Sequence, residues 1–494
     1  MKHTAVIQKN RQILNKLFSG KEELNEIREK FLEEAGLASC QPSRTTIATG
    51  HQPLIFYPGL FFKNVFTHQL AEESETSPVN FLVDTDVAGF QVQVPYRHEN
   101  EYRKKQISVK NPDELTYYSF EPSEQQVQDF LDETANAVHT LSHEEIEGAL
   151  RKFRSAFFHF YNETRQFGET VNFLRNDFQY KQGMNFSNFP VSDIAGSEAY
   201  SRYVLYIIEH IESFQRAYNQ AVEIHKSGDY QPVKFLAFEN GWYELPFWLI
   251  EYGQRHQVFI KEEADTITFS SASANKEITF DRYAGREEML SQMRVELTLY
   301  PKATTLTLMI RLFLCDVFVH GTGAVEYEKV NNEFLRLFFS MDEPPAFFTA
   351  TGEIYLPLAD FPDDYTRLQA EYRKKQHWLN EVKRDPEQFL DEKLADQYKA
   401  QKKELAQHLQ KEKDSKQRRE INRQLESINE KMLKELEPRI HHVNSEMNYY
   451  RKVLDKKHVF YERTYPYFLY PEGYLTRRRF ENYMRSELVE GNKG

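Results

Sequence analysis

The segment that most constrains the fold is residues 45–86, where two short β-prone runs flank one helical run. Thr45–Thr49 is rich in β-branched residues and stops at a Gly-His-Gln-Pro turn. Leu60–Ala71 has the apolar spacing of a helix, and Val79–Val83 is an apolar run of the buried-strand type. Strand, helix and strand within about 40 residues form a βαβ unit, which requires a parallel sheet. The segment therefore predicts an α/β fold.

Other runs extend this prediction along the chain. Thr304–Val319 is a second dense apolar run, in which a strand is expected to end near Val319, and Ala324–Phe339 follows it with a helical pattern. We expect the strand that ends near Val319 to lie beside the 45–86 unit in one mostly parallel sheet. Residues 124–227 are predicted to be mainly helical, and residues 256–281 are predicted to form a strand pair or hairpin.

A charged segment, residues 365–455, has apolar residues at spacings of three and four. This pattern predicts a coiled-coil arm with a stutter near Pro438 and the tip of a helical hairpin between Gln410 and Glu420. Two helices of about 30 residues would project roughly 45 Å. A helix pair packed along the body is the alternative, but we expect an arm that forms a homodimer. The predicted divisions are a core of residues 1–364, the arm, and a segment of residues 456–494 that returns to the core.

Composition limits the class of protein. The chain has 494 residues and a formal net charge of −12, which disfavours a nucleic-acid partner. Its two cysteines, Cys40 and Cys315, are too few for a disulfide framework. The first residues lack the apolar stretch of a signal peptide, and the run Leu306–Val319 contains Arg311 and Asp316, so it cannot span a bilayer unaided. We expect a cytoplasmic protein that does not contact membranes.

The first candidate site is the turn after the first predicted strand, with Gly50, His51 and Gln52, and Lys63 farther on. Glycine allows a ligand to approach the backbone, and open α/β sheets bind ligands at the carboxyl edge of their strands. Lys63, near a helix start, could meet a phosphate. The alternative is a turn shaped by glycine and proline with a structural histidine.

Two further candidates follow the other predicted strands. Asp84 and Asp86 stand at the end of the 79–83 run, where they could bind a substrate hydroxyl or a metal, although surface loops also carry such acids. The last candidate is the turn ahead of the 324–339 helix, which consists of His320, Gly321, Thr322 and Gly323. It is predicted to bind an anion, with Lys302 and Arg311 as further partners of a phosphate. The common nucleotide, hydrolase and zinc motifs are missing from the sequence, and no metal is predicted.

In this order the motifs resemble those of the cysteine-adding enzymes of bacillithiol biosynthesis. The likeness covers the turn at residues 49–53, the acids at 84–86, the turn at 320–327, the charged helices, and a closing motif at 469–478. The chain departs from the family at several positions, so the resemblance is to a divergent member. Between the acids, Thr85 stands where the family usually has histidine. In the glycine turn, Thr322 stands in place of proline and Ala324 in place of glutamate. In the closing motif, Thr476-Arg477 stands in place of Gln-Glu.

The resemblance implies a Rossmann-like core with inserted segments and a coiled coil used for dimerisation. It implies amide formation between cysteine and the amine of glucosaminyl-malate, an amino sugar, and we assume that ATP activates the carboxyl. The candidate catalytic residues are His51, Asp84 and Asp86. The candidate nucleotide-binding residues for ATP or ADP are Gly50, Gln52, Lys63, His320, Gly321, Thr322 and Gly323. Two alternatives stay open: a non-catalytic dimeric protein that binds a metabolite, and a metal-assisted hydrolase.

Overall fold

The computed structural model describes two compact units of the chain. The described residues are 2–34, 45–99, 101–226, 231–358, 364–412, 414–454 and 459–489, so Cys40 lies outside them. Unit 1 comprises residues 1–221, 235–358 and 462–494, and unit 2 comprises residues 222–234 and 359–461.

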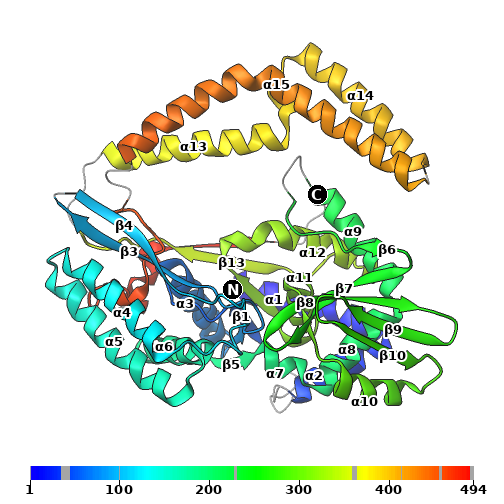
Figure 1. Ribbon diagram of the computed structural model, residues 1–494, viewed down its shortest axis with the longest axis horizontal. Coiled ribbons are helices and arrows are strands. Elements are labelled where there is room, and N and C mark those ends of the chain that lie inside the picture. Colours follow the sequence, from blue (N-terminus) through cyan, green and yellow to red (C-terminus); the bar gives the residue numbers. More distant parts are fainter. Residues whose placement is uncertain are drawn as a thin grey trace. The chain divides into compact units, whose positions relative to one another are not determined.

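The centre of unit 1 is a six-stranded sheet with the order β14-β13-β12-β1-β2-β5 (Figure 1). Every neighbouring pair is parallel except β13 and β14. The strands are β1 (Ile47–His51), β2 (Val79–Leu82), β5 (Ser187–Pro190), β12 (Val317–His320), β13 (Phe347–Gly352) and β14 (Met484–Val489). The prediction of an α/β fold with a mostly parallel sheet is therefore confirmed.

The predicted βαβ unit is the middle of this sheet. Helix α3 (Pro58–Glu73) connects β1 to β2, and β12 pairs with the other side of β1, with Thr49 opposite Val319. The helix is apolar nearly all round because it is buried, and Phe66 packs into the sheet core with Ile47 and Val319. Gly352 of β13 permits this packing, since a side chain there would overlap the ring of Phe62. Local apolar patterns and one close glycine contact thus position the ends of β1 and β12.

The apolar run Thr304–Val319 contains the expected strand only at its end. Residues Ala303–Met309 form helix α11, Ile310–Leu314 continue it as a π-helical turn, and only Val317–His320 is a strand. Nearly every residue in this run is buried. A run buried on all sides has no polar face, so neither helical nor strand periodicity is visible in the sequence.

A second sheet of unit 1 is antiparallel, with the order β10-β9-β8-β7-β11 and β6 beside β7. Residues 256–281 were predicted to form a strand pair, but they lie in three of its strands. The sequence of this region shows the alternation of strands but does not reveal the turn at residues 263–265. The strands are β6 (Phe238–Glu239), β7 (Trp242–Glu251), β8 (Gln254–Glu262), β9 (Thr266–Ser271), β10 (Lys276–Asp281) and β11 (Leu299–Pro301).

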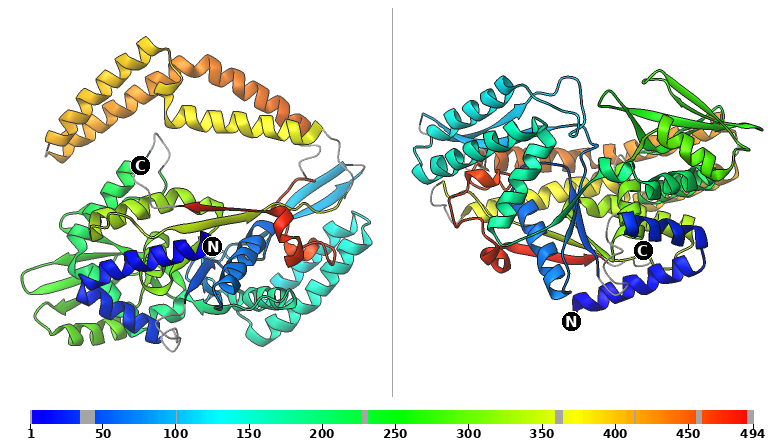
Figure 2. Two further views of the ribbon diagram at one scale, coloured as in Figure 1. Left: turned by 180° about the vertical axis from the view of Figure 1, so that it is seen from behind. Right: turned by 90° about the horizontal axis from the view of Figure 1, so that it is seen from below.

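A hairpin and three helices form another insertion, and it lies at the end of unit 1 opposite the antiparallel sheet (Figures 1 and 2). The sequence did not predict the hairpin. Its elements are β3 (Phe90–His98), β4 (Glu101–Val109), α4 (Glu124–His139), α5 (Glu144–Thr164) and α6 (Phe167–Lys181). The other helices that begin in unit 1 are α1 (Lys2–Ser19), α2 (Glu22–Glu34), α7 (Val191–Ala195), α8 (Glu198–Glu209), α9 (Ile211–His225), α10 (Arg286–Glu296), α12 (Val325–Phe339) and α16 (Phe480–Tyr483).

Unit 2 contains three long helices rather than the two predicted. They are α13 (Asp364–Arg384), α14 (Glu392–Lys411) and α15 (Ser415–Leu454). The predicted tip is confirmed by the turn between α14 and α15, and α13 and α14 lie along different parts of α15 (Figure 1). Pro438 lies inside α15. A proline in the interior of a helix removes one backbone hydrogen bond, so the predicted bend at this position is expected for α15. Ile428, Met432 and Leu436 are buried within this packing, so part of the apolar seam is used inside one chain.

Candidate functional site

The carboxyl ends of β1 and β12 lie side by side at the middle of the parallel sheet. From β1 the chain proceeds through α3 to β2 on one side, and from β12 it proceeds through α12 to β13 on the other. Because the two connections leave in opposite directions, they do not cover the space above the strand ends. The last residues of these strands, His51 and His320, therefore border an opening of the sheet edge.

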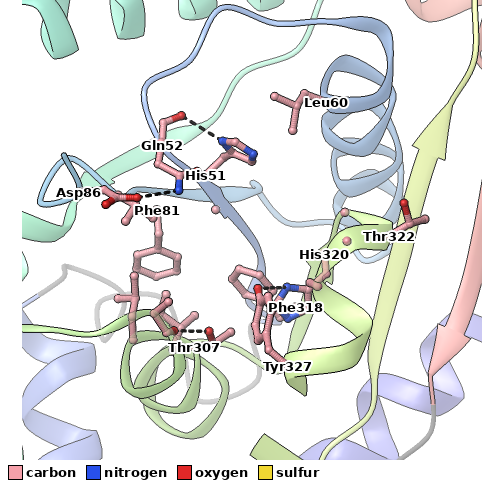
Figure 3. A pocket seen from close by; sticks show the side chains of 18 of the residues that line it. His51, Gln52, Leu60, Phe81, Asp86, Thr307, Phe318, His320, Thr322 and Tyr327 are labelled. Atoms are coloured by element: carbon pink, nitrogen blue, oxygen red, sulfur yellow. Dashed lines mark hydrogen bonds between the residues drawn. The ribbon is translucent and has the colours of Figure 1, made fainter. Parts of the chain in front are cut away.

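A cavity of about 470 Å³ occupies this position (Figure 3). Eight of the ten site residues named from the sequence line it: Gly50, His51, Gln52, Asp86, His320, Gly321, Thr322 and Gly323. Lys63 and Asp84 are not among its lining residues. The turn after β1 and Asp86 are thus brought together with a turn more than 200 residues farther along the sequence, whereas two of the predicted side chains serve other contacts.

The turn after β1 is held by the carbonyl of Gln52. The backbone N–H of Leu54 donates to this oxygen at 2.7 Å, and the ring Nδ1 of His51 lies 3.3 Å from it. The amide side chain of Gln52 points the other way and donates to Asp86 at 2.9 Å (Figure 3). At Gly50 the strand approaches β2 so closely that an added Cβ would lie 3.1 Å from the carbonyl of Phe81. A side chain at this position would crowd the β2 backbone, which glycine avoids.

Two buried cations lie behind this turn. Lys63 of α3 donates to the Gly50 carbonyl at 2.9 Å, and Arg175 of α6 donates to the Gln52 carbonyl at 3.2 Å. Each residue is only 2% exposed. Burial, reinforced for Lys63 by the charge of Arg175, lowers the pKa of Lys63 to about 7 and that of Arg175 to about 10. Within the described residues, neither cation has a carboxylate as an ion-pair partner.

Asp84 is a structural acid in this arrangement. Its carboxylate accepts a 3.0 Å hydrogen bond from the backbone N–H of Ser192 and another from the Ser192 hydroxyl, at the start of α7. Burial raises the pKa of Asp84, and the bonds from Ser192 oppose that shift. The side chain thus ties the end of β2 to the start of α7 and leaves Asp86 as the acid that lines the cavity.

The two histidines of the cavity are neutral at physiological pH. Burial, with the nearby charges of Lys63 and Arg175, lowers the pKa of His51 to about 3. Burial, with the charges of Arg311 and Lys63, lowers the pKa of His320 well below its usual range. The Nδ1 contact of His51 with a carbonyl oxygen requires the Nδ1–H tautomer, so Nε2 keeps a lone pair. His51 can therefore accept a proton or a hydrogen bond but carries no standing charge.

Behind His320 lies a fully buried ion pair between Arg311 and Glu328. Glu328 Oε1 is 3.5 Å from Nε2 of His320, and the Tyr327 hydroxyl is 3.5 Å from its Nδ1 (Figure 3). Arg311 also donates to Asn332 at 2.8 Å. The sequence suggested Arg311 as a phosphate partner, but its contacts are those of a buried paired charge. The pair positions the helix that follows the glycine turn.

The turn from Gly321 to Gly323 leads through a short 3-10 segment, Thr322–Ala324, into α12. Thr322 and Gly323 are exposed, and no atom lies within 4 Å of a Cβ built on Gly321 or Gly323. Amide N–H groups at the start of a helix have no partner within the helix and favour negative charge. The turn therefore offers an open backbone surface to an anionic group.

Sequence reasoning missed the wall that the antiparallel sheet contributes. Trp248 of β7 and Arg255 of β8 line the cavity, as does Arg463, which follows unit 2 in the sequence. Arg255 Nη1 lies 2.7 Å from Asp86 Oδ1. An arginine in an alternating strand has no local signal of function, because its side chain reaches the site only when the two sheets pack.

Comparison with known proteins gives no family. The chain matches no protein-family model, and a search of curated proteins finds no match. Across the described ranges, His, Cys, Asp and Glu form no group of three or more that could hold a metal ion. Among the helices that are described, none has the length and hydropathy needed to cross a membrane.

Proposed function

We propose that this chain is an enzyme that forms an amide between an amino acid, cysteine in the first instance, and the amine of an amino sugar. The observation that carries the proposal is the meeting of three distant motifs at one cavity between β1 and β12. The motifs are those through which the chain resembles the cysteine-adding enzymes of bacillithiol biosynthesis. We therefore take glucosaminyl-malate as the first acceptor to test.

The topology of the sheet supports a Rossmann-like assignment. Numbered in chain order, its six strands are arranged 3-2-1-4-5-6, which is the order of dinucleotide-binding folds. In such sheets the ligand binds beyond the carboxyl ends of the first and fourth strands, where the connections diverge. Those strands are β1 and β12 in this chain, and the cavity lies at their ends.

The charge balance supports an anionic substrate such as ATP. Lys63 and Arg175 place positive charge behind the β1 turn without a carboxylate to neutralise it. Lys63 acts electrostatically on both His51 and His320, so its charge is felt on both sides of the opening. Residues Gly321 to Gly323 line the same cavity, and the space around both glycines is open to a ligand that could accept from their backbone N–H groups. Phosphate oxygens would satisfy these donors, and the charge would be strongest in a site that excludes water.

The chemistry needs one activation and one proton transfer. ATP would convert the amino-acid carboxylate into a phosphorylated or adenylylated acyl group, and the acceptor amine would then attack the acyl carbon. As the new carbon–nitrogen bond forms, the phosphate or nucleotide leaves and the nitrogen loses a proton. His51, with a lone pair on Nε2, would accept that proton once the negative charge of the bound phosphates has raised its pKa from about 3, and Asp86, which lines the cavity, would hold the ammonium group of the amino acid.

A homodimer remains a second proposal, for unit 2. Its charged helices bury only part of their apolar seam within the chain, and Tyr449 on α15 is 64% exposed. Removing residues 386–437 should leave a monomer by light scattering if these helices join two copies. An unchanged number of chains per particle would assign the helices another role and would favour a metabolite-binding scaffold only if activity were also lacking.

The direct test is product formation. Purified protein, ATP, cysteine and glucosaminyl-malate should yield the cysteinyl amide by mass spectrometry, with ATP consumed in equal amount. His51→Gln should lower kcat by about 10²–10⁴-fold with little change in folding, the range for loss of a general base. A control, Gln254→Ala, changes a residue that does not line the cavity and should leave kcat unchanged. Absence of any amide with cysteine, serine or alanine as donor would contradict the proposal.

A further inference from the structure

The charged groups on the cavity lining form an uneven set. Among the lining residues that the structure describes, Asp86 is the one carboxylate, and Arg255 lies against it with a 2.7 Å contact. Both side chains remain partly exposed, at 31% and 25%. The other lining cation, Arg463, pairs with Glu353 at 3.2 Å. An ammonium group that enters the cavity therefore meets a single acid, and a carboxylate beside it meets Arg255.

The guanidinium of Arg255 lies over an aromatic ring. Its guanidinium carbon lies 5.0 Å from the ring centroid of Trp248, and the same ring carries the ammonium of Lys302 at 4.7 Å. Its Nε is buried and has no hydrogen-bond partner in the described part of the chain. A guanidinium has five N–H donors in a rigid fork, and stacking on an aromatic ring fixes how that fork is directed. Arg255 can thus donate to a second carboxylate without first becoming ordered.

Asp86 is ordered in the same way. Gln52 donates to its Oδ2 at 2.9 Å, and the backbone N–H of Val87 donates to its Oδ1 at 2.9 Å. A carboxylate has about four acceptor positions, so one remains after the contacts with Gln52, Val87 and Arg255. The acid is therefore directed by its neighbours and can still accept from a ligand.

Apolar side chains adjoin this charged pair. Phe81 lies on the strand that ends before Asp86 and turns its ring into the cavity (Figure 3). Val83 and Leu306 also line the cavity. A ligand that places its charges at Asp86 and Arg255 would have an apolar surface available for a short side chain or a thiol.

We propose that Asp86 and Arg255 form the subsite for the free amino acid, with its α-ammonium on Asp86 and its α-carboxylate on Arg255. This inference rests on the proposed function and assigns one substrate of that reaction to named residues. A zwitterion inserted between the two side chains replaces one ion pair by two. A molecule with only one of the two charges disrupts the pair and leaves one member uncompensated, which is costly in a partly desolvated site.

Calorimetric titration of the full chain with three ligands, under reducing conditions and without ATP, tests the subsite. The ligands are cysteine, 3-mercaptopropionate, which lacks the ammonium, and cysteamine, which lacks the carboxylate. Cysteine should bind at least about tenfold more tightly than either, a difference that titration resolves readily. Asp86→Asn should weaken cysteine and cysteamine but not 3-mercaptopropionate. Arg255→Met should weaken cysteine and 3-mercaptopropionate but not cysteamine, and Arg255→Lys should restore part of the loss.

Arg282→Met is the matched control, because Arg282 pairs with Glu262 at the other side of the same sheet and does not line the cavity. Its ligand affinities should equal those of the wild type. Equal affinity for all three ligands overturns the subsite, even if a variant fails to fold. An amide product formed by Arg255→Met with an unchanged KM for cysteine overturns the subsite alone. Charge-selective binding that both variants abolish, without amide formation by the wild type, supports the subsite and overturns the proposed reaction.

Discussion

Two groups of cations lie in or behind the walls of the cavity, and they differ in how their charge is balanced. On the wall formed by the antiparallel sheet, Arg255 pairs with Asp86, and Lys302 pairs with Glu244 at 2.6 Å. Behind the β1 turn, Lys63 and Arg175 donate to backbone carbonyls and have no carboxylate partner within the described chain. The wall is electrostatically complete in the protein alone. The β1 turn is not, and an anionic substrate would complete it.

The largest effect should follow from breaking a pair on the wall. Glu244→Leu removes the ion pair of Lys302 and the acceptor for Gln257, which donates to Glu244 at 3.0 Å. Because both members of the pair are largely buried, we expect the free energy of unfolding to fall by about 3 kcal/mol. Chemical denaturation followed by circular dichroism measures this change.

The control for that variant is Glu262→Gln in the same sheet. Glu262 pairs with Arg282 at 3.3 Å, and both are substantially exposed, so its loss should cost less than about 1 kcal/mol. If Glu244→Leu and Glu262→Gln were equally mild, the wall would not depend on its buried pair, and the comparison with the β1 turn would fail.

Removing the charge of Lys63 should raise the free energy of unfolding, in contrast to the loss expected for Glu244→Leu. The folded-state pKa of Lys63 is about 7, below its value in the unfolded chain, so the unfolded state binds more protons between pH 7 and about 10. Wild-type stability therefore rises with pH across this window through Lys63. Lys63→Met should be more stable than wild type at pH 6 by about 1–2 kcal/mol, after loss of the bond to Gly50, and the advantage should disappear by pH 10. A variant that is less stable at pH 6 would mean that Lys63 has a counter-charge.

A smaller effect is expected for His51. Its pKa is about 3 in the folded protein and near 6.5 in the unfolded chain, so the unfolded state binds more protons between these values. Stability from this group is lost as pH falls from 6.5 toward 3. His51→Gln should reduce the loss between pH 6.5 and pH 4.5 by about 1 kcal/mol, a modest figure because the side chain is only half-buried. Identical acid denaturation curves for the two proteins would contradict this assignment.

Features that depend on neighbouring residues in sequence could be predicted. The β-branched run before Gly50, the helix with Lys63 and the apolar run before Asp84 indicated the βαβ unit, and its parallel pairing with the strand ending at His320 is confirmed. The glycines of the two turns indicated where the sheet edge opens, since glycine is needed where backbone or ligand approaches closely. These signals are local, so they survive without knowledge of the fold.

Features that depend on long-range packing could not be predicted from the sequence. Lys63 has the expected place near the start of a helix, but its ammonium reaches Gly50 rather than the cavity. Arg175 and Arg255 come from the helical insertion and the antiparallel sheet, and no pattern around them shows that they meet the β1 turn and Asp86. The helix within the 304–319 run could not be recognised from the sequence either, because a segment that is buried on every side has no periodic pattern of apolar residues.

The central claim is that an anionic substrate completes the charge behind the β1 turn, and proton-linked calorimetry tests it most directly. ATP is titrated into wild type and Lys63→Met at pH 7 in two buffers of different ionisation enthalpy. An anion near Lys63 raises its pKa from about 7, so wild type should take up as much as about half a proton more per site than the variant and should bind more tightly. Equal proton uptake and equal affinity in the two proteins would contradict the account.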